Sequence, residues 1–160
     1  MKIGICAVGR MKAGPEKDLA GRYLDRFAKA ARPLGLEFAG IHEIVESRSR
    51  TADERRRDEA ERLRGAFPEG GAVIALDERG GTMTSEDFAA RLAALRDGGH
   101  RALTVVIGGP DGLDPSIRGQ AELVLSFGAL TWPHQLVRIM LAEQLYRAAT
   151  ILSGHPYHRA

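Results

Sequence analysis

Cysteine, aromatic residues and net charge are all scarce in this chain of 160 residues. The single cysteine, Cys6, excludes an internal disulfide and a multi-cysteine zinc site, which is typical of proteins from a reducing cytoplasm. No metal-binding framework is visible, so we expect no metal. Lys and Arg number 23 against 21 Asp and Glu, and the formal charge of +2 is too small by itself to indicate nucleic-acid binding.

Long hydrophobic runs are also missing. No stretch approaches the ~18 consecutive apolar residues that a membrane span requires. The apolar residues 1–9 form too short a run for a signal-peptide core, and Arg10 and Lys12 follow at once. Residues 136–152, the most apolar later segment, are interrupted by charged side chains, as in a helix of a water-soluble protein. The sequence therefore predicts a cytoplasmic protein with no membrane contact.

The remaining composition is that of an ordinary globular protein. Hydrophobic residues make up 44% of the chain and charged residues 28%, a mixture too apolar for disorder. There is no repeat and no linker rich in Pro, Gly or Ser. At roughly 100–200 residues per domain, we expect residues 1–160 to form a single domain.

Short apolar, β-branched runs alternate with helical patterns along the chain. Strands are expected at residues 2–8, 36–44, 72–76, 103–107 and 122–126, and helices at 16–30, 51–66, 84–98 and from Pro133 onward. Thr51 and Glu54 have the spacing of a capping box, in which each side chain satisfies a free amide at the start of a helix. Unbroken apolar strands alternating with helices indicate an α/β fold with a parallel sheet covered on both faces.

Ligands of such sheets bind beyond the carboxyl ends of the strands. Segments 75–77, 107–112 and 126–134 are the distinctive strand ends here, although a Gly-Gly pair alone is more often an ordinary turn. The phosphate-binding motifs G-x-x-x-x-G-K-[ST] and G-x-G-x-x-G are both missing, which argues against an ATPase or a typical dehydrogenase. The G-x-S-x-G and H-E-x-x-H motifs are missing as well.

Several motifs together resemble the RlmH family, the ribosomal large-subunit pseudouridine methyltransferases of the SPOUT class. They are IGGPDGL at 107–113, LTWPH at 130–134 followed by Val137-Arg138, EQLYR at 143–147 and HPYHR at 155–159. The similarity covers essentially the whole chain. It implies an α/β fold with a deep C-terminal trefoil knot, a homodimer, and S-adenosylmethionine as methyl donor. It also implies methylation at N3 of a pseudouridine in 23S rRNA of the assembled ribosome.

The same resemblance implies where the donor binds. The expected contacts are Leu76, Gly108, Phe127, Gly128, Ala129, Leu130, Thr131 and Trp132. A related tRNA methyltransferase and a non-catalytic ribosome-binding factor of the same fold remain as alternatives. The short chain, with no appended domain to grip a tRNA, argues against the first, and the intact glycine loop and tail argue against the second.

Methyl transfer to an imide nitrogen requires alignment of donor and acceptor and removal of the imide proton. The candidates for assisting that step are His134, Tyr157, His158 and Arg159. We favour His158 as the base because its ordinary pKa lies near neutrality and the surrounding tail is polar. The alternatives are that His134 only caps the last helix and that the tail only anchors RNA.

Two surface patterns allow two interpretations each. The last helix carries apolar residues almost all round its circumference, namely Leu136, Val137, Ile139, Met140 and Leu141. A partner subunit would bury them, and the alternative is a core helix of a monomer.

The arginines of residues 48–64 are interleaved with acidic residues, which favours pairing along a solvated helix over an rRNA-binding patch. Lys2, Arg10 and Lys12 are other candidates for phosphate contacts.

Overall fold

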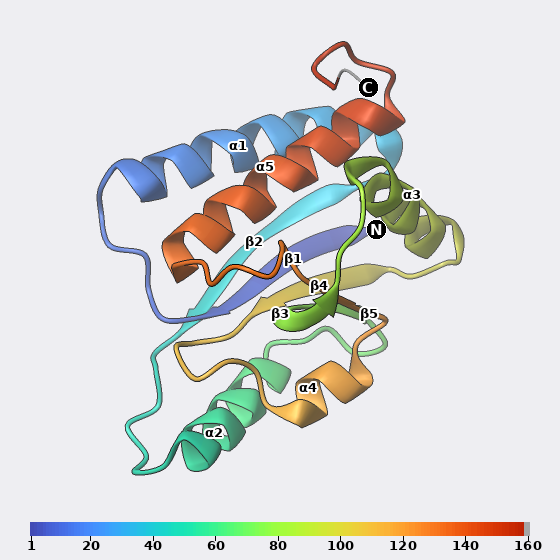
Figure 1. Ribbon diagram of the computed structural model, residues 1–160. Helices are drawn as coiled ribbons and strands as arrows, with labels where there is room; N and C mark the ends of the chain where they lie inside the picture. Colours follow the sequence, from blue (N-terminus) through green and yellow to red (C-terminus); the bar gives the residue numbers. More distant parts are fainter. Residues whose placement is uncertain (159–160) are drawn as a thin grey trace.

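The computed structural model describes residues 1–158, in which a five-stranded parallel sheet lies between two layers of helices (Figure 1). The strands are β1 (Lys2–Val8), β2 (Glu37–Ile44), β3 (Ala72–Gly81), β4 (Ala102–Ile107) and β5 (Leu123–Leu125). Their order across the sheet is β2-β1-β4-β3-β5, and every pairing is parallel. The predicted α/β class with a parallel sheet is confirmed.

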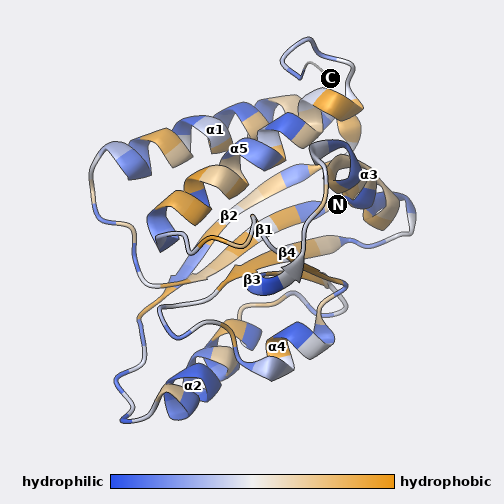
Figure 2. Ribbon diagram, viewed as in Figure 1, coloured by the Kyte–Doolittle hydropathy of each residue, from blue (hydrophilic) through white to orange (hydrophobic). Residues whose placement is uncertain are grey.

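Helices cover both faces of the sheet, as expected. On one face lie α1 (Pro15–Ala31), α3 (Ser85–Asp97) and α5 (His134–Leu152), and on the other α2 (Ala52–Arg64) and α4 (Pro115–Gln120). A short 3-10 turn, Arg32–Leu34, follows α1. Each layer of helices has its own hydrophobic cluster against the sheet. Figure 2 shows why: the strands are predominantly apolar, so both faces must be covered.

Local sequence sets where the helices begin. The Thr51 hydroxyl accepts a hydrogen bond from the Glu54 amide at 3.2 Å, and the Glu54 carboxylate accepts one from the Thr51 amide at 3.0 Å. The capping box predicted at this position is confirmed. Thr84 caps α3 in a similar way, since its hydroxyl accepts a hydrogen bond from the Asp87 amide at 3.1 Å.

The structure differs from the predicted elements near β5. Strand β3 does not stop at Leu76 but continues to Gly81, whose carbonyl accepts a hydrogen bond from the Ser126 amide at 2.9 Å. A Cβ atom on Gly80 would lie 2.6 Å from the carbonyl carbon of Leu125, so the two strands are in direct backbone contact there. The extension of β3 beyond Leu76 therefore requires glycine at position 80. The knot implied by the resemblance stays a prediction.

The remaining differences concern two prolines. Helix α4 was not expected, because its six residues carry only one buried apolar side chain, Ile117. The sequence does contain a signal for this helix, Asp114 followed by Pro115, because an Asp cap followed by proline often starts a helix. The prediction that Pro133 is the first residue of α5 is wrong: it is the N-cap, and His134 comes first.

A buried arginine fixes α5 to the sheet. Arg138 is only 6% exposed, and one of its terminal nitrogens donates to the carbonyls of Val8 at 3.1 Å and Gly9 at 2.5 Å. The other terminal nitrogen pairs with Glu43, which also accepts a hydrogen bond from the Met11 amide at 3.0 Å. The last helix is thus tied to the carboxyl ends of β1 and β2.

No helix within residues 1–158 is long and apolar enough to cross a lipid bilayer. In the same residues, no cluster of three or more His, Cys, Asp and Glu side chains is placed to hold a metal ion. Cys6 lies buried in β1, and burial raises the pKa of its thiol to about 11. The thiol therefore stays protonated at neutral pH, and Cys6 is a residue of the core rather than a nucleophile.

Candidate functional site

A cleft of about 310 Å³ opens at the carboxyl edge of the sheet, where β3, β4 and β5 end beside the start of α5. Its walls are residues 76–79, 107–113, 125–128 and 130–132, together with Arg56, Pro115, Arg118, His134 and Val137. The strand-end segments singled out in the sequence therefore meet in one place. They do so because parallel strands present their carboxyl ends at the same edge.

The expected donor contacts are almost all brought together in this cleft. Leu76, Gly108, Phe127, Gly128, Leu130, Thr131 and Trp132 line it. Ala129 lies in the same loop but outside the lining, and it is exposed. Sequence reasoning missed three charged members of the lining, Glu78, Arg79 and Arg118, because none belongs to a recognisable motif.

Tight turns present bare backbone on two walls of the cleft. In the β4–α4 loop, the Gly112 amide donates to the Gly109 carbonyl at 2.9 Å, and Gly112 has a φ of 81°. On the opposite wall, the Ser126 hydroxyl organises the turn by contacting both the amide and the carbonyl of Gly128, whose φ is 119°. A Cβ atom on Gly112 or Gly128 would meet nothing within 4 Å, so a ligand can approach either backbone closely.

Two ion pairs hold the walls of the cleft in place. Arg55 binds both carboxylate oxygens of Asp111, with nitrogen–oxygen distances of 2.6 and 3.0 Å. This hydrogen bonding is the main reason that the pKa of Asp111 is lowered. On the other side of the loop, Arg118 donates to Asp77 at 3.1 Å and to the carbonyl of Leu113 at 2.8 Å.

The arginines of α2 are largely used within the chain. Their partners are Asp111 for Arg55, Asp53 for Arg56, Asp58 for Arg62 and Ser116 for Arg64. Pairing along the helix, as the sequence indicated, accounts for Arg56 and Arg62. Arg55 and Arg64 instead reach other elements, which a helical pattern could not show.

His134 lies half-buried at the first turn of α5 and lines the cleft. Burial, and secondarily the charge of Arg138, lowers the pKa of His134. Its imidazole is therefore neutral at pH 7. The alternative that His134 only caps the helix is wrong, since the cap residue is Pro133 and no side chain makes a cap hydrogen bond there.

The described part of the tail packs on the far end of α5. The Tyr157 hydroxyl donates to Glu143 at 3.1 Å. Burial is the largest cause that raises the pKa of Tyr157 to about 12, and hydrogen bonding to Tyr23 and Glu143 adds to it. One ring nitrogen of His158 lies 2.5 Å from Glu86 and the other 3.3 Å from Arg147. Arg159 lies outside the described residues.

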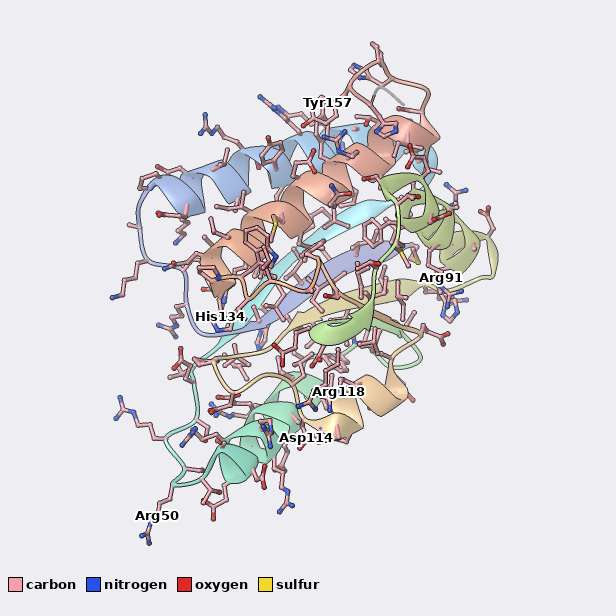
Figure 3. All side chains as sticks on the ribbon, viewed as in Figure 1. Arg50, Arg91, Asp114, Arg118, His134 and Tyr157 are labelled. Atoms are coloured by element: carbon pink, nitrogen blue, oxygen red, sulfur yellow. The ribbon has the colours of Figure 1, made fainter. Side chains whose placement is uncertain are left out.

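Tail and cleft lie apart within one chain. His134 and Tyr157 are at opposite ends of α5 (Figure 3). A helix of 19 residues spans roughly 28 Å at about 1.5 Å per residue. The structure therefore brings the expected donor contacts together but does not bring Tyr157 and His158 to the cleft of their own chain.

Comparison with protein families identifies the family to which this chain belongs. A family model described as "Predicted SPOUT methyltransferase" matches residues 1–158. This chain belongs to the SPOUT methyltransferase family. The RlmH resemblance is also confirmed: a protein of Mesorhizobium japonicum named "Ribosomal RNA large subunit methyltransferase H" is 65% identical over 160 residues, covering 100% of both chains. Relatives of the same name from Brucella anthropi and Rhizobium meliloti are each 61% identical over the full length of both chains.

Among solved structures, this SPOUT methyltransferase is similar to one described as a probable methylase family protein from Haemophilus influenzae Rd KW20. The TM-score is 0.51 at 13% sequence identity, and the match covers 99% of this chain and 70% of that one. At such low identity the likeness shows the fold alone.

Proposed function

We propose that this SPOUT methyltransferase transfers a methyl group from S-adenosylmethionine to N3 of a pseudouridine in 23S rRNA of the assembled ribosome. The observation that carries the proposal is the cleft in which the strand-end segments of β3, β4 and β5 meet. The names of its relatives, at 58–65% identity over the whole chain, support the rRNA substrate.

The cleft suits S-adenosylmethionine in size and in chemistry. Its volume of about 310 Å³ lies at the lower end of the ~300–1,000 Å³ typical of ligand sites. Leu76, Ile107 and Val137 give it an apolar side for a purine, while Gly112 and Gly128 leave backbone groups free for polar contacts. When bound, S-adenosylmethionine supplies an activated methyl on a sulfonium.

The protein's chemical task is to accept the N3 proton. Tyr157, with a pKa of about 12, keeps its proton at neutral pH and is suited to donating a hydrogen bond. At His158, the nitrogen facing the Arg147 guanidinium must be the acceptor, and the one facing Glu86 carries the proton. His158 can therefore take up the imide proton on exchanging Arg147 for the substrate. Neutral His134, already in the cleft, is the second candidate.

In a homodimer, Tyr157 and His158 of one subunit can act at the cleft of the other subunit, although tail and cleft lie far apart within one chain. A twofold interface brings the same surface of both subunits together. If two α5 helices pack antiparallel, the tail of one subunit lies beside the cleft of the other. Leu130, Trp132 and Leu136, which are 73%, 38% and 39% exposed near the start of α5, supply apolar surface for such contact.

The cleft opens on an edge of the sheet that also carries unpaired basic residues. Arg10 and Lys12 follow β1, and Arg48 and Arg50 follow β2. None of these side chains forms an ion pair within residues 1–158. Since β1 and β2 end at the same edge as β4, these loops are suited to rRNA phosphates.

The substitutions Arg48→Ala and Arg50→Ala together should weaken ribosome binding and reduce its salt dependence. Loss of two phosphate contacts should lower the slope of log affinity against log salt by about 1.5. Affinity for S-adenosylmethionine should not change. The matched control is Arg32→Ala with Arg101→Ala, two arginines at the opposite edge. Equal slopes for the two double variants would remove these loops from the RNA interface.

The proposed reaction is tested with the purified full chain. Calorimetry should detect binding of S-adenosylmethionine, and radiolabelled methyl should appear in 23S rRNA of ribosomes from a strain lacking this modification. Absence of binding at millimolar donor would instead indicate a non-catalytic binder. Transfer to free tRNA but not to ribosomes would favour the tRNA methyltransferase alternative and overturn the substrate proposed here.

A further inference from the structure

The β4–α4 loop, residues 108–114, forms one wall of the cleft, and its glycines allow the backbone many conformations. Gly108, Gly109 and Gly112 all lie within it. Glycine loses more conformational freedom on folding than any other residue. The single backbone bridge between Gly109 and Gly112 closes the turn but does not fix it to the rest of the protein. Gly109 packs against Val8, and Leu113 is 3% exposed in the core, so packing holds the two ends of the loop. The tip, residues 110–112, must be held by side chains from other elements.

Arg55 holds the tip of this loop. Its guanidinium makes a two-point contact with Asp111, while its remaining terminal nitrogen donates to the carbonyls of Ser49 at 3.1 Å and Arg50 at 3.2 Å. The side chains of Arg55 and Asp111 are only 29% and 25% exposed. Arg56 adds a hydrogen bond to the Asp111 carbonyl at 3.3 Å. One arginine thus joins the β2–α2 loop to the cleft wall.

Arg118 holds the base of the same loop. Its hydrogen bonds to Asp77 and to the Leu113 carbonyl join the middle of β3 to the end of the loop. The Asp77 side chain is 5% exposed, so this pair is shielded from water. By contrast, Arg62 pairs with Asp58 on its own helix, with side chains 37% and 46% exposed, and donates to the Val45 carbonyl at 2.8 Å. None of these residues lines the cleft.

We propose that Arg55 and Arg118 are positioning residues for the methyl donor, which set the separation of the cleft walls by clamping the β4–α4 loop at its tip and its base. The proposal rests on the proposed function in one respect, that the donor is S-adenosylmethionine. Arg55 lies outside the cleft lining, and Arg118, which lines the cleft, already uses a terminal nitrogen for Asp77 and the Leu113 carbonyl. Their effect arises because a loop that is already ordered loses less freedom when a ligand binds.

The guanidinium group is what the clamp requires. A lysine carries the same charge, but its ammonium group is compact and cannot make the two-point contact with a carboxylate. At position 55 it could not also reach the two carbonyls of the β2–α2 loop from the same planar group. Substitution of Arg55 by lysine therefore keeps the charge and removes the geometry. Arg118 makes both of its contacts through one terminal nitrogen, so its test is removal of the side chain in Arg118→Ala.

The substitutions Arg55→Lys and Arg118→Ala are the direct test, with Arg62→Lys as the matched control for Arg55→Lys. The dissociation constant of S-adenosylmethionine, measured by calorimetry, should rise about tenfold in each test variant, within the range of couplings found in such networks. The maximal rate at saturating donor should change less than about twofold. Backbone amides of residues 108–113 should exchange hydrogen faster, while Arg62→Lys should match the parent in every measurement.

A substitution in the partner of Arg55 shows whether a loss of donor affinity comes from this contact rather than from misfolding. Asp111→Asn keeps the shape of the side chain and removes its charge, and it should raise the same dissociation constant. Because Arg55 and Asp111 act through one contact, combining their substitutions should add little to either alone. Unchanged donor affinity in Arg55→Lys and Asp111→Asn, with a parent protein that binds normally, would overturn the clamp alone. A parent that binds no donor would overturn the proposed function and the clamp with it.

Discussion

Replacing Gly80 with alanine should destabilise the protein and abolish donor binding. The new methyl group would lie 2.6 to 2.8 Å from backbone atoms of Val124 and Leu125, distances that real Cβ atoms do not tolerate. No side chain can move aside to relieve the clash, so β3 and β5 must separate. The expected loss is about 3 kcal/mol or more in the free energy of unfolding.

Gly81→Ala is the control for this experiment, one residue along the same strand. A Cβ atom there would meet nothing within 4 Å, and the backbone does not have a positive φ. Its unfolding free energy should stay within about 0.5 kcal/mol of the parent. Denaturant unfolding and calorimetry with S-adenosylmethionine measure both effects. Equal stability of the two variants would mean that β3 and β5 do not make the close contact described.

Removing the imidazole of His158 should slow methyl transfer about 1,000-fold at saturating donor, because a positioned base contributes about 10² to 10⁴. Donor affinity should be nearly unchanged in His158→Ala, since the cleft lies at the other end of α5. Single-turnover transfer to ribosomes is the measurement. A rate equal to that of the parent would exclude His158 from the mechanism and leave His134 as the candidate base.

Mixing two inactive variants tests which subunit supplies the tail. His158→Ala keeps an intact cleft, whereas Gly128→Val keeps an intact tail but places a β-branched side chain in the cleft, at a φ of 119°. If each tail serves the partner's cleft, refolding the two chains together should restore about a quarter of the parent activity. Half of the dimers would then be mixed, with one competent site each. No recovery, or a monomeric mass in solution, would contradict this arrangement.

The sequence predicted those features that depend on neighbouring residues. The capping box at Thr51 and Glu54 is such a feature, because both partners lie within one turn. The place of the cleft was also predictable, since parallel strands with apolar centres end at a common edge and the glycine-rich segment 107–112 follows one of them.

Features that depend on distant partners were beyond sequence reasoning. Arg55 looks like any arginine of a charged helix, and only the fold shows that it binds Asp111, 56 positions away. The continuation of β3 to Gly81 depends on β5, which follows it by about forty residues in the chain. The separation of His158 from the cleft likewise follows from the straight course of α5 rather than from any motif.

The anchoring of Arg138 has a consequence for how the protein folds. Its partners, Val8, Gly9 and Glu43, lie 95 to 130 positions before it in the chain. Contacts between such distant parts of a chain form late in folding. Because the helix that carries Arg138 also lines the cleft, the cleft is complete only after α5 has folded back onto the ends of β1 and β2.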